Sequence, residues 1–140
     1  MPHDLQLEVI HRVAGELRKV AVFADLPEDQ LAWLAERFEE VRLEPGTIFV
    51  RPGDPVEHLL VLLEGEVRWQ RNDMPDGPSF TARAVQVTGL LPYSRLTGAE
   101  ATGRAILPTR ALRLHKDHFP EMLRRMPELG KRLVALMSDR

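Results

Sequence analysis

Histidines and carboxylates are the residues of this chain that could carry out acid–base or metal chemistry. The sequence holds five histidines and 21 Asp and Glu residues. His115 and His118 flank two polar residues and could be read as a metal pair. A metal site of the cupin type would need two histidines one residue apart on a strand with a further Glu and His, and no His-x-His occurs. We therefore expect no metal ligands here and interpret the carboxylates as solvated surface.

Nucleophilic and phosphate-transfer chemistry both lack their usual motifs. The chain has no cysteine, no Gly-x-Ser-x-Gly turn around a serine, and no glycine-rich phosphate loop followed by Lys and Ser or Thr. The sequence therefore predicts a protein that is not an enzyme, without catalytic residues and without a resident cofactor.

The composition is typical of one globular domain. The chain has 140 residues, of which 44% are hydrophobic and 29% charged, enough for a core of its own. A formal net charge of −2 argues against direct nucleic-acid binding, which usually needs a basic surface. No run approaches the roughly 20 apolar residues of a membrane span, and no signal peptide begins the chain. We therefore expect a cytoplasmic protein with no membrane partner.

Helical periodicity marks both ends of the chain. Apolar residues spaced three and four apart predict helices within residues 4–38 and again within 117–140. In the last helix this spacing favours either a seam that forms a homodimer or a face that packs on its own domain. Because the pattern still runs at Arg140 without a capping glycine or proline, we expect the N-terminal part of a longer protein. The seam residues are Met126, Leu129, Leu133 and Leu136.

Between residues 40 and 116 the pattern changes to short apolar runs separated by turns. Pro-Gly and Glu-Gly turn sequences recur through this region. Leu112 and Leu114 alternate with Arg113, as expected for a half-buried strand. Regularly spaced short strands predict a sandwich or barrel-like β domain, and hence an α+β protein. The other expected strands are Ile48–Val50, Leu59–Leu63, Val67–Trp69 and Phe80–Val87.

Three segments, in this order, resemble the catabolite activator protein-like cyclic nucleotide-binding domain family. They are Val22–Leu26, Leu43–Asp54 and Leu63–Val67. The resemblance covers roughly residues 20–137. It implies an antiparallel β-roll, a jelly-roll-like double-stranded β-helix, flanked by N-terminal and C-terminal helices in one domain over residues 1–140.

The resemblance also implies a ligand-binding cassette within residues 87–105. The family holds the ligand's phosphate on the N-terminus of a short helix, with a Glu for the ribose and an Arg for the phosphate. Here the Glu position is Leu90, and the Arg position falls near Ala99 or Glu100. The usual pair of contacts is therefore missing from this cassette.

Two interpretations of the altered cassette stay open. A helix that begins at Pro92 would leave the amides of Tyr93 and Ser94 free to bind an anion. Arg95 or Arg104 would then supply positive charge, and Tyr93 could stack on a base. Alternatively, Tyr93 is a core or rim aromatic and the arginines are solvated or paired. On the first interpretation the ligand-binding residues are Gly89, Leu90, Leu91, Pro92, Tyr93, Ser94, Arg95 and Arg104, with Met137 and Ser138 from the last helix.

The sequence thus predicts a regulatory module for a small anionic ligand, such as cAMP, cGMP or a relative. The ligand would bind between the β-roll and the helix that begins at Pro127, which would signal to a partner or output domain. Residues 92–98 and 118–123 are similar to a bacterial subset of the family, which implies a histidine-kinase-type ATP-binding module as the output. The alternative is a ligand-free domain that serves as a dimerisation scaffold.

Overall fold

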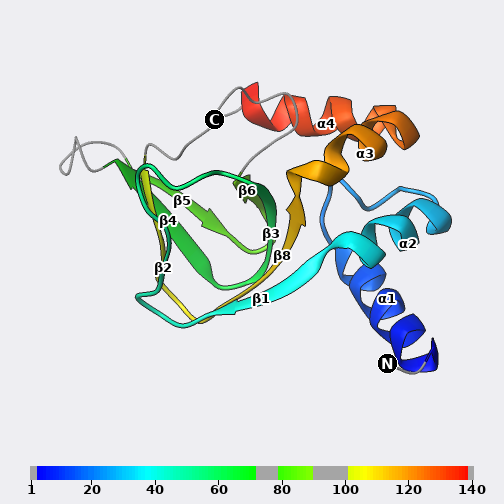
Figure 1. Ribbon diagram of the computed structural model, residues 1–140, viewed down its shortest axis with the longest axis horizontal. Coiled ribbons are helices and arrows are strands. Elements are labelled where there is room, and N and C mark those ends of the chain that lie inside the picture. Colours follow the sequence, from blue (N-terminus) through cyan, green and yellow to red (C-terminus); the bar gives the residue numbers. More distant parts are fainter. Residues whose placement is uncertain (1–2, 72–78, 90–100, 139–140) are drawn as a thin grey trace. The chain divides into compact units, whose positions relative to one another are not determined.

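The computed structural model describes residues 3–71, 79–89 and 101–138. Within these residues the chain forms two compact units (Figure 1). One unit is helical and comprises residues 1–38 and 117–140, and the other is the β-sheet region from Glu39 to Lys116. The α+β class and the antiparallel β-roll predicted from the sequence are confirmed.

The helical unit contains both predicted helical regions. Helix α2 begins after Pro27, whose φ of −56° suits a helix start, and two acidic residues of its first turn, Glu28 and Asp29, complement the helix dipole. No helix of the described residues has the length and apolar character needed to cross a bilayer. The four helices are α1 (His3–Leu17), α2 (Glu28–Arg37), α3 (Phe119–Arg125) and α4 (Pro127–Ser138).

The apolar seam near the C-terminus belongs to the core of the helical unit. Met126, Leu129 and Leu133 are 2%, 0% and 0% exposed within this single chain. Met126 is the C-cap of α3 and not part of α4, which begins one residue later. Of the two alternatives for this seam, the structure shows packing within the chain, so these three side chains offer no exposed surface to a second copy.

The β-sheet unit is built from two four-stranded antiparallel sheets that form the open roll seen in Figure 1. The first sheet has the order β1-β8-β3-β6 and the second the order β2-β7-β4-β5. The strands are β1 (Glu39–Leu43), β2 (Ile48–Val50), β3 (His58–Glu64), β4 (Glu66–Arg71), β5 (Ser79–Arg83), β6 (Val87–Gly89), β7 (Ala101–Ala105) and β8 (Thr109–His115).

Three details of the strands differ from the sequence prediction. The expected strand Phe80–Val87 is divided into β5 and β6, because residues 84–86 form a turn, and neither β1 nor β7 was predicted. Strand β7 contains Gly103, a weak strand former, and is held by pairing with β2 and β4 on either side. Long-range pairing, invisible to local propensity, therefore determines this strand.

Buried side chains between the two sheets form a compact apolar cluster. Its buried members are Leu62, Val67, Ala82 and Ala111, and Val41, Leu43 and Phe49 pack against them. These residues come from both sheets, so the cluster joins the two walls of the roll.

Candidate functional site

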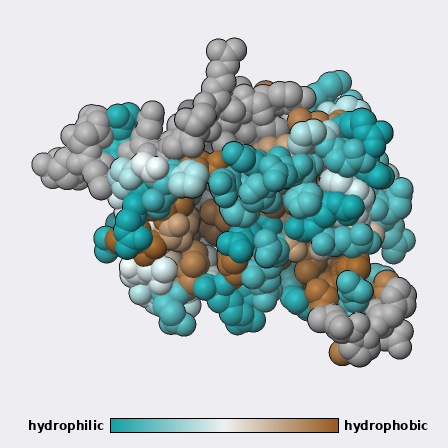
Figure 2. All heavy atoms as spheres, viewed as in Figure 1, coloured by the Kyte–Doolittle hydropathy of each residue, from teal (hydrophilic) through white to brown (hydrophobic). Residues whose placement is uncertain are grey.

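The interior of the β-roll contains a cavity of about 170 Å³. In Figure 2 hydrophobic side chains are visible inside the opening of the roll. Because side chains alternate along each strand, residues from both sheets point into this space. The lining residues are Val41, Leu43, Phe49, Val50, Pro55, Val56, Glu57, His58, Leu60, Leu62, Val67, Trp69, Gly89, Ala111 and Arg113.

Two aromatic side chains form a fixed wall of the cavity. Phe49 of β2 and Trp69 of β4 meet edge to face, with ring centroids 5.3 Å apart and an interplanar angle of 78°, a favourable aromatic geometry. The Trp69 indole Nε1 donates a hydrogen bond to Thr88 Oγ1 across the roll, at 3.1 Å. Thr88 is only 2% exposed, so this bond satisfies a buried donor and a buried hydroxyl together. The indole is therefore held in one orientation.

Gly89 lies in the cavity wall at the end of β6. Its φ is +78°, and a Cβ atom at this position would lie 2.7 Å from the backbone oxygen of His58 on the paired strand β3. Only glycine fits both this conformation and this close approach. The glycine predicted as a ligand-binding residue thus borders the cavity.

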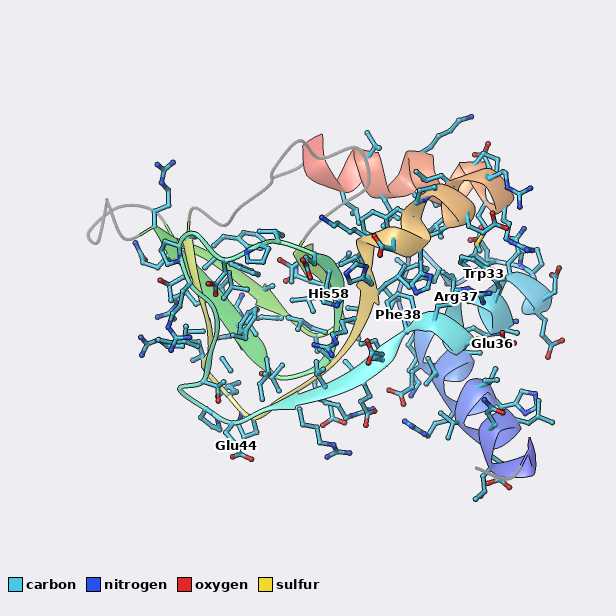
Figure 3. All side chains as sticks on the ribbon, viewed as in Figure 1. Trp33, Glu36, Arg37, Phe38, Glu44 and His58 are labelled. Carbon is cyan, nitrogen blue, oxygen red and sulfur yellow. The ribbon has the colours of Figure 1, made fainter. Side chains whose placement is uncertain are left out.

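Polar side chains collect at the open end of the cavity. Arg113 of β8 stands between Glu39 of β1 and Leu60 of β3 in the strand register. Its Nε lies 3.5 Å from Glu39 Oε1, and Glu57 Oε2 lies 3.6 Å from His115 Nε2. Figure 3 shows His58 at this end of the roll, beside the end of β8. One arginine and two carboxylates therefore surround the opening with the histidines.

The two histidines at this end stack on each other. The rings of His58 and His115 are T-shaped with centroids 5.0 Å apart. Desolvation by burial lowers the pKa of His58 from its ordinary value of 6.5, and the positive charge of Arg113 lowers it further. His58 is consequently neutral at pH 7, where it acts as a hydrogen-bonding group without a charge.

The structure places the predicted ligand-binding residues in different regions. Gly89 lines the cavity. Arg104 is exposed on β7, directly opposite Arg68 of β4, and lines a depression with Ile48, Gln70, Thr102 and Ile106 instead of the cavity. Met137 and Ser138 belong to the last turn of α4. Leu90, Leu91, Pro92, Tyr93, Ser94 and Arg95 lie outside the described residues.

Of the lining residues, Gly89 was predicted as ligand-binding and the others were missed, among them Phe49, Trp69 and Arg113. The alternation of Arg113 with Leu112 and Leu114 was interpreted as one buried and one solvent-facing side. In the structure the two leucines are 0% exposed, yet Arg113 also faces inward, toward the cavity. The available signal was the spacing of two between Arg113 and the apolar Ala111, which places both on one face of the strand. Among the described residues, no cluster of three His, Asp or Glu side chains could hold a metal ion.

The sequence matches the cyclic nucleotide-binding domain over residues 40–126, so the chain belongs to this family of regulatory domains. The protein CNGC15a of Medicago truncatula is 27% identical over 109 residues, which are 77% of this chain and only 14% of that protein. The N-terminal domain of a transcriptional regulator from Streptomyces coelicolor is 29% identical, with a TM-score of 0.68 and coverage of 89% of each chain.

The fold is also similar to a protein kinase regulator. The regulatory subunit of a cAMP-independent protein kinase A from Trypanosoma brucei superposes with a TM-score of 0.81 at 18% identity. The match covers 96% of this chain and 47% of that one. At this identity the likeness concerns the fold.

Proposed function

We propose that this domain is a regulatory module that binds a small anionic ligand of the cyclic nucleotide class in its β-roll. The observation that carries the proposal is the cavity, with a fixed aromatic wall and polar groups at its open end. Small-molecule sites typically combine such apolar walls with a few convergent polar groups. Family membership supports the same class of ligand.

The ligand panel should extend beyond cAMP. The Trypanosoma brucei protein of similar fold is described as belonging to a cAMP-independent kinase, so this fold also serves regulators that do not respond to cAMP. In this chain the cassette positions for the ribose Glu and the phosphate Arg hold Leu90 and, near the second, Ala99 and Glu100. Other cyclic nucleotides and nucleosides are therefore candidates of equal standing.

Signalling would pass through the C-terminal helices. Strand β8 lines the cavity and ends at His115, and the 3-10 turn Lys116–His118 and α3 follow without a spacer. A ligand that binds one position of these helices better than another would shift the population between them. We propose that α4 transmits this shift to an output domain, for which a histidine-kinase-type ATP-binding module is the candidate.

Isothermal titration calorimetry tests ligand binding directly. The 140-residue chain is titrated with cAMP, cGMP and cyclic dinucleotides, and its melting temperature is measured with each. Val41→Phe should place a ring in the cavity and abolish the heat. Arg42→Phe adds the same ring at an exposed neighbour on β1, whose side chain is 77% exposed, and should leave binding unchanged. Absence of both heat and a melting shift with every ligand would refute the proposal.

A further inference from the structure

The size and shape of the cavity suit one planar ring system. Its volume is about 170 Å³, which is below the roughly 300–1,000 Å³ of sites that enclose a whole drug-sized ligand. An apolar cavity of about 150 Å³ in a protein core can take up benzene. Phe49 and Trp69 supply flat apolar surfaces on one side, and Leu60 lines the cavity as well. The described walls therefore accommodate the base of a nucleotide better than its phosphate and ribose.

The polar end of the cavity offers an unused hydrogen-bond donor. Within the described residues the buried Nε of Arg113 has no hydrogen-bond acceptor. The Glu39 carboxylate, 3.5 Å from Nε, lies beyond the usual N–H···O range of about 2.7–3.2 Å. A buried donor without a partner is costly. A ligand that brings acceptors to this point would remove that cost.

The charges at this end do not favour a phosphate. The Glu39 carboxylate lies near Arg113, and the Glu57 carboxylate lies near His115. His58 adds no positive charge at pH 7, because burial lowers its pKa. An anion placed here would meet the two carboxylates as well as the Arg113 guanidinium. A neutral group with hydrogen-bond acceptors meets no such repulsion.

From these three observations we propose that Arg113 recognises the base of the ligand and selects guanine over adenine. Guanine presents two neighbouring acceptors, O6 and N7, which match the planar fork of an arginine. Adenine presents one acceptor and one donor on the same edge, which would leave an Arg113 donor facing another donor. The proposal rests on the proposed function, since it concerns the same cavity, and it assigns the ligand's phosphate to a different part of the site.

Binding constants of guanosine, cGMP, adenosine and cAMP test the proposal. They are measured by calorimetry for the 140-residue chain and for the variants Arg113→Lys, Arg113→Gln and Arg68→Lys. The unaltered chain should bind each guanine compound at least about fivefold more tightly than its adenine counterpart. Arg113→Lys keeps the charge but loses the planar fork, so it should bring this ratio close to one, as should Arg113→Gln. Arg68→Lys, on the exposed face of β4, should leave the ratio unchanged, and melting curves should show all variants folded.

Three results would overturn the proposal, and they differ from one another. Binding of cyclic nucleotides without a base preference would refute base selection and leave the proposed function standing. Equal weakening of cGMP and cAMP by Arg113→Gln, with guanosine unaffected, would make Arg113 a phosphate ligand. No binding of any compound to the unaltered chain would refute the proposed function itself.

Discussion

Two glycines of similar conformation but different surroundings permit a sharp prediction. Gly65 lies in the turn between β3 and β4, and Gly46 lies in the turn between β1 and β2. Gly65 has a φ of +97° and Gly46 a φ of +87°. A Cβ atom at Gly46 would meet nothing within 4 Å. A Cβ atom at Gly65 would overlap Thr109 Oγ1 and lie 2.5 Å from the backbone oxygen of Pro108. The two positions thus share the backbone cost of alanine but not the steric cost.

The magnitudes follow from these contacts. An L-residue at positive φ costs about 1–2 kcal/mol. The free energy of unfolding should fall by this amount in both Gly46→Ala and Gly65→Ala. Overpacking costs about a further 1–3 kcal/mol. This cost applies only to Gly65→Ala, because the backbone oxygen of Pro108 cannot move aside as a flexible side chain could. The displaced Thr109 hydroxyl also donates to Leu107 O at 2.8 Å. We therefore expect about 2–5 kcal/mol of destabilisation for Gly65→Ala.

Urea denaturation of the two variants measures this difference. The midpoint of unfolding should fall for both, with Gly65→Ala well below Gly46→Ala and with similar slopes. Equal midpoints would show that the close approach to Pro108 and Thr109 is absent or freely relaxed. The path of the turn between β3 and β4, which belong to different sheets, would then need revision.

Three further predictions concern the helical unit and the cavity wall. Leu133→Asp should destabilise the fold by at least about 3 kcal/mol, because it buries an unpaired carboxylate. Val134→Asp, at a neighbouring residue that is 37% exposed, should change stability by no more than about 0.5 kcal/mol. Thermal unfolding and sedimentation measure both effects, and a Leu133→Asp variant that merely separated a stable dimer into folded monomers would contradict the prediction. Asp25 has its pKa lowered below 3.8 by a hydrogen bond from an arginine of α4, so its contribution to stability is present above that pH and is lost as the pH falls through the lower, folded-state value. Asp25→Asn should therefore show a smaller drop in melting temperature between about pH 5 and pH 3 than the unaltered chain, and parallel curves would contradict the ion pair. Trp69→Phe should cost about 1–3 kcal/mol by leaving the Thr88 hydroxyl without its partner, and a double-mutant cycle with Thr88→Val should show coupling; additive losses would mean that the bond contributes nothing.

The placement of Arg113 on the cavity side changes how the altered cassette is interpreted. The sequence shows only that the family's Glu and Arg positions are not filled in the usual way. The structure adds an apolar cavity with its own guanidinium, contributed by β8 and therefore by a different strand. A β-roll that has lost one pair of polar contacts can thus still offer a specific hydrogen-bonding surface to a ligand.

Local patterns in the sequence were enough to determine the helices, most strands and the turns. Helical spacing of apolar residues locates α1, α2 and α4, and the glycine after Glu64 locates the turn at Gly65, where φ is positive. These features depend on near neighbours in the chain, through side-chain periodicity and through backbone conformations that only glycine adopts readily. They are therefore readable without knowledge of the rest of the fold.

Only the tertiary structure decided what covers each apolar face and which face of a strand is the inner one. Periodicity groups Met126, Leu129 and Leu133 on one face, but whether that face meets another copy or its own chain depends on distant residues. Alternation groups Arg113 apart from Leu112 and Leu114, yet when a strand is buried on both faces it cannot tell which of the two sets faces the cavity. Burial is a property of the assembled sheets and helices, and neither a spacing of two nor one of 3.6 residues encodes it.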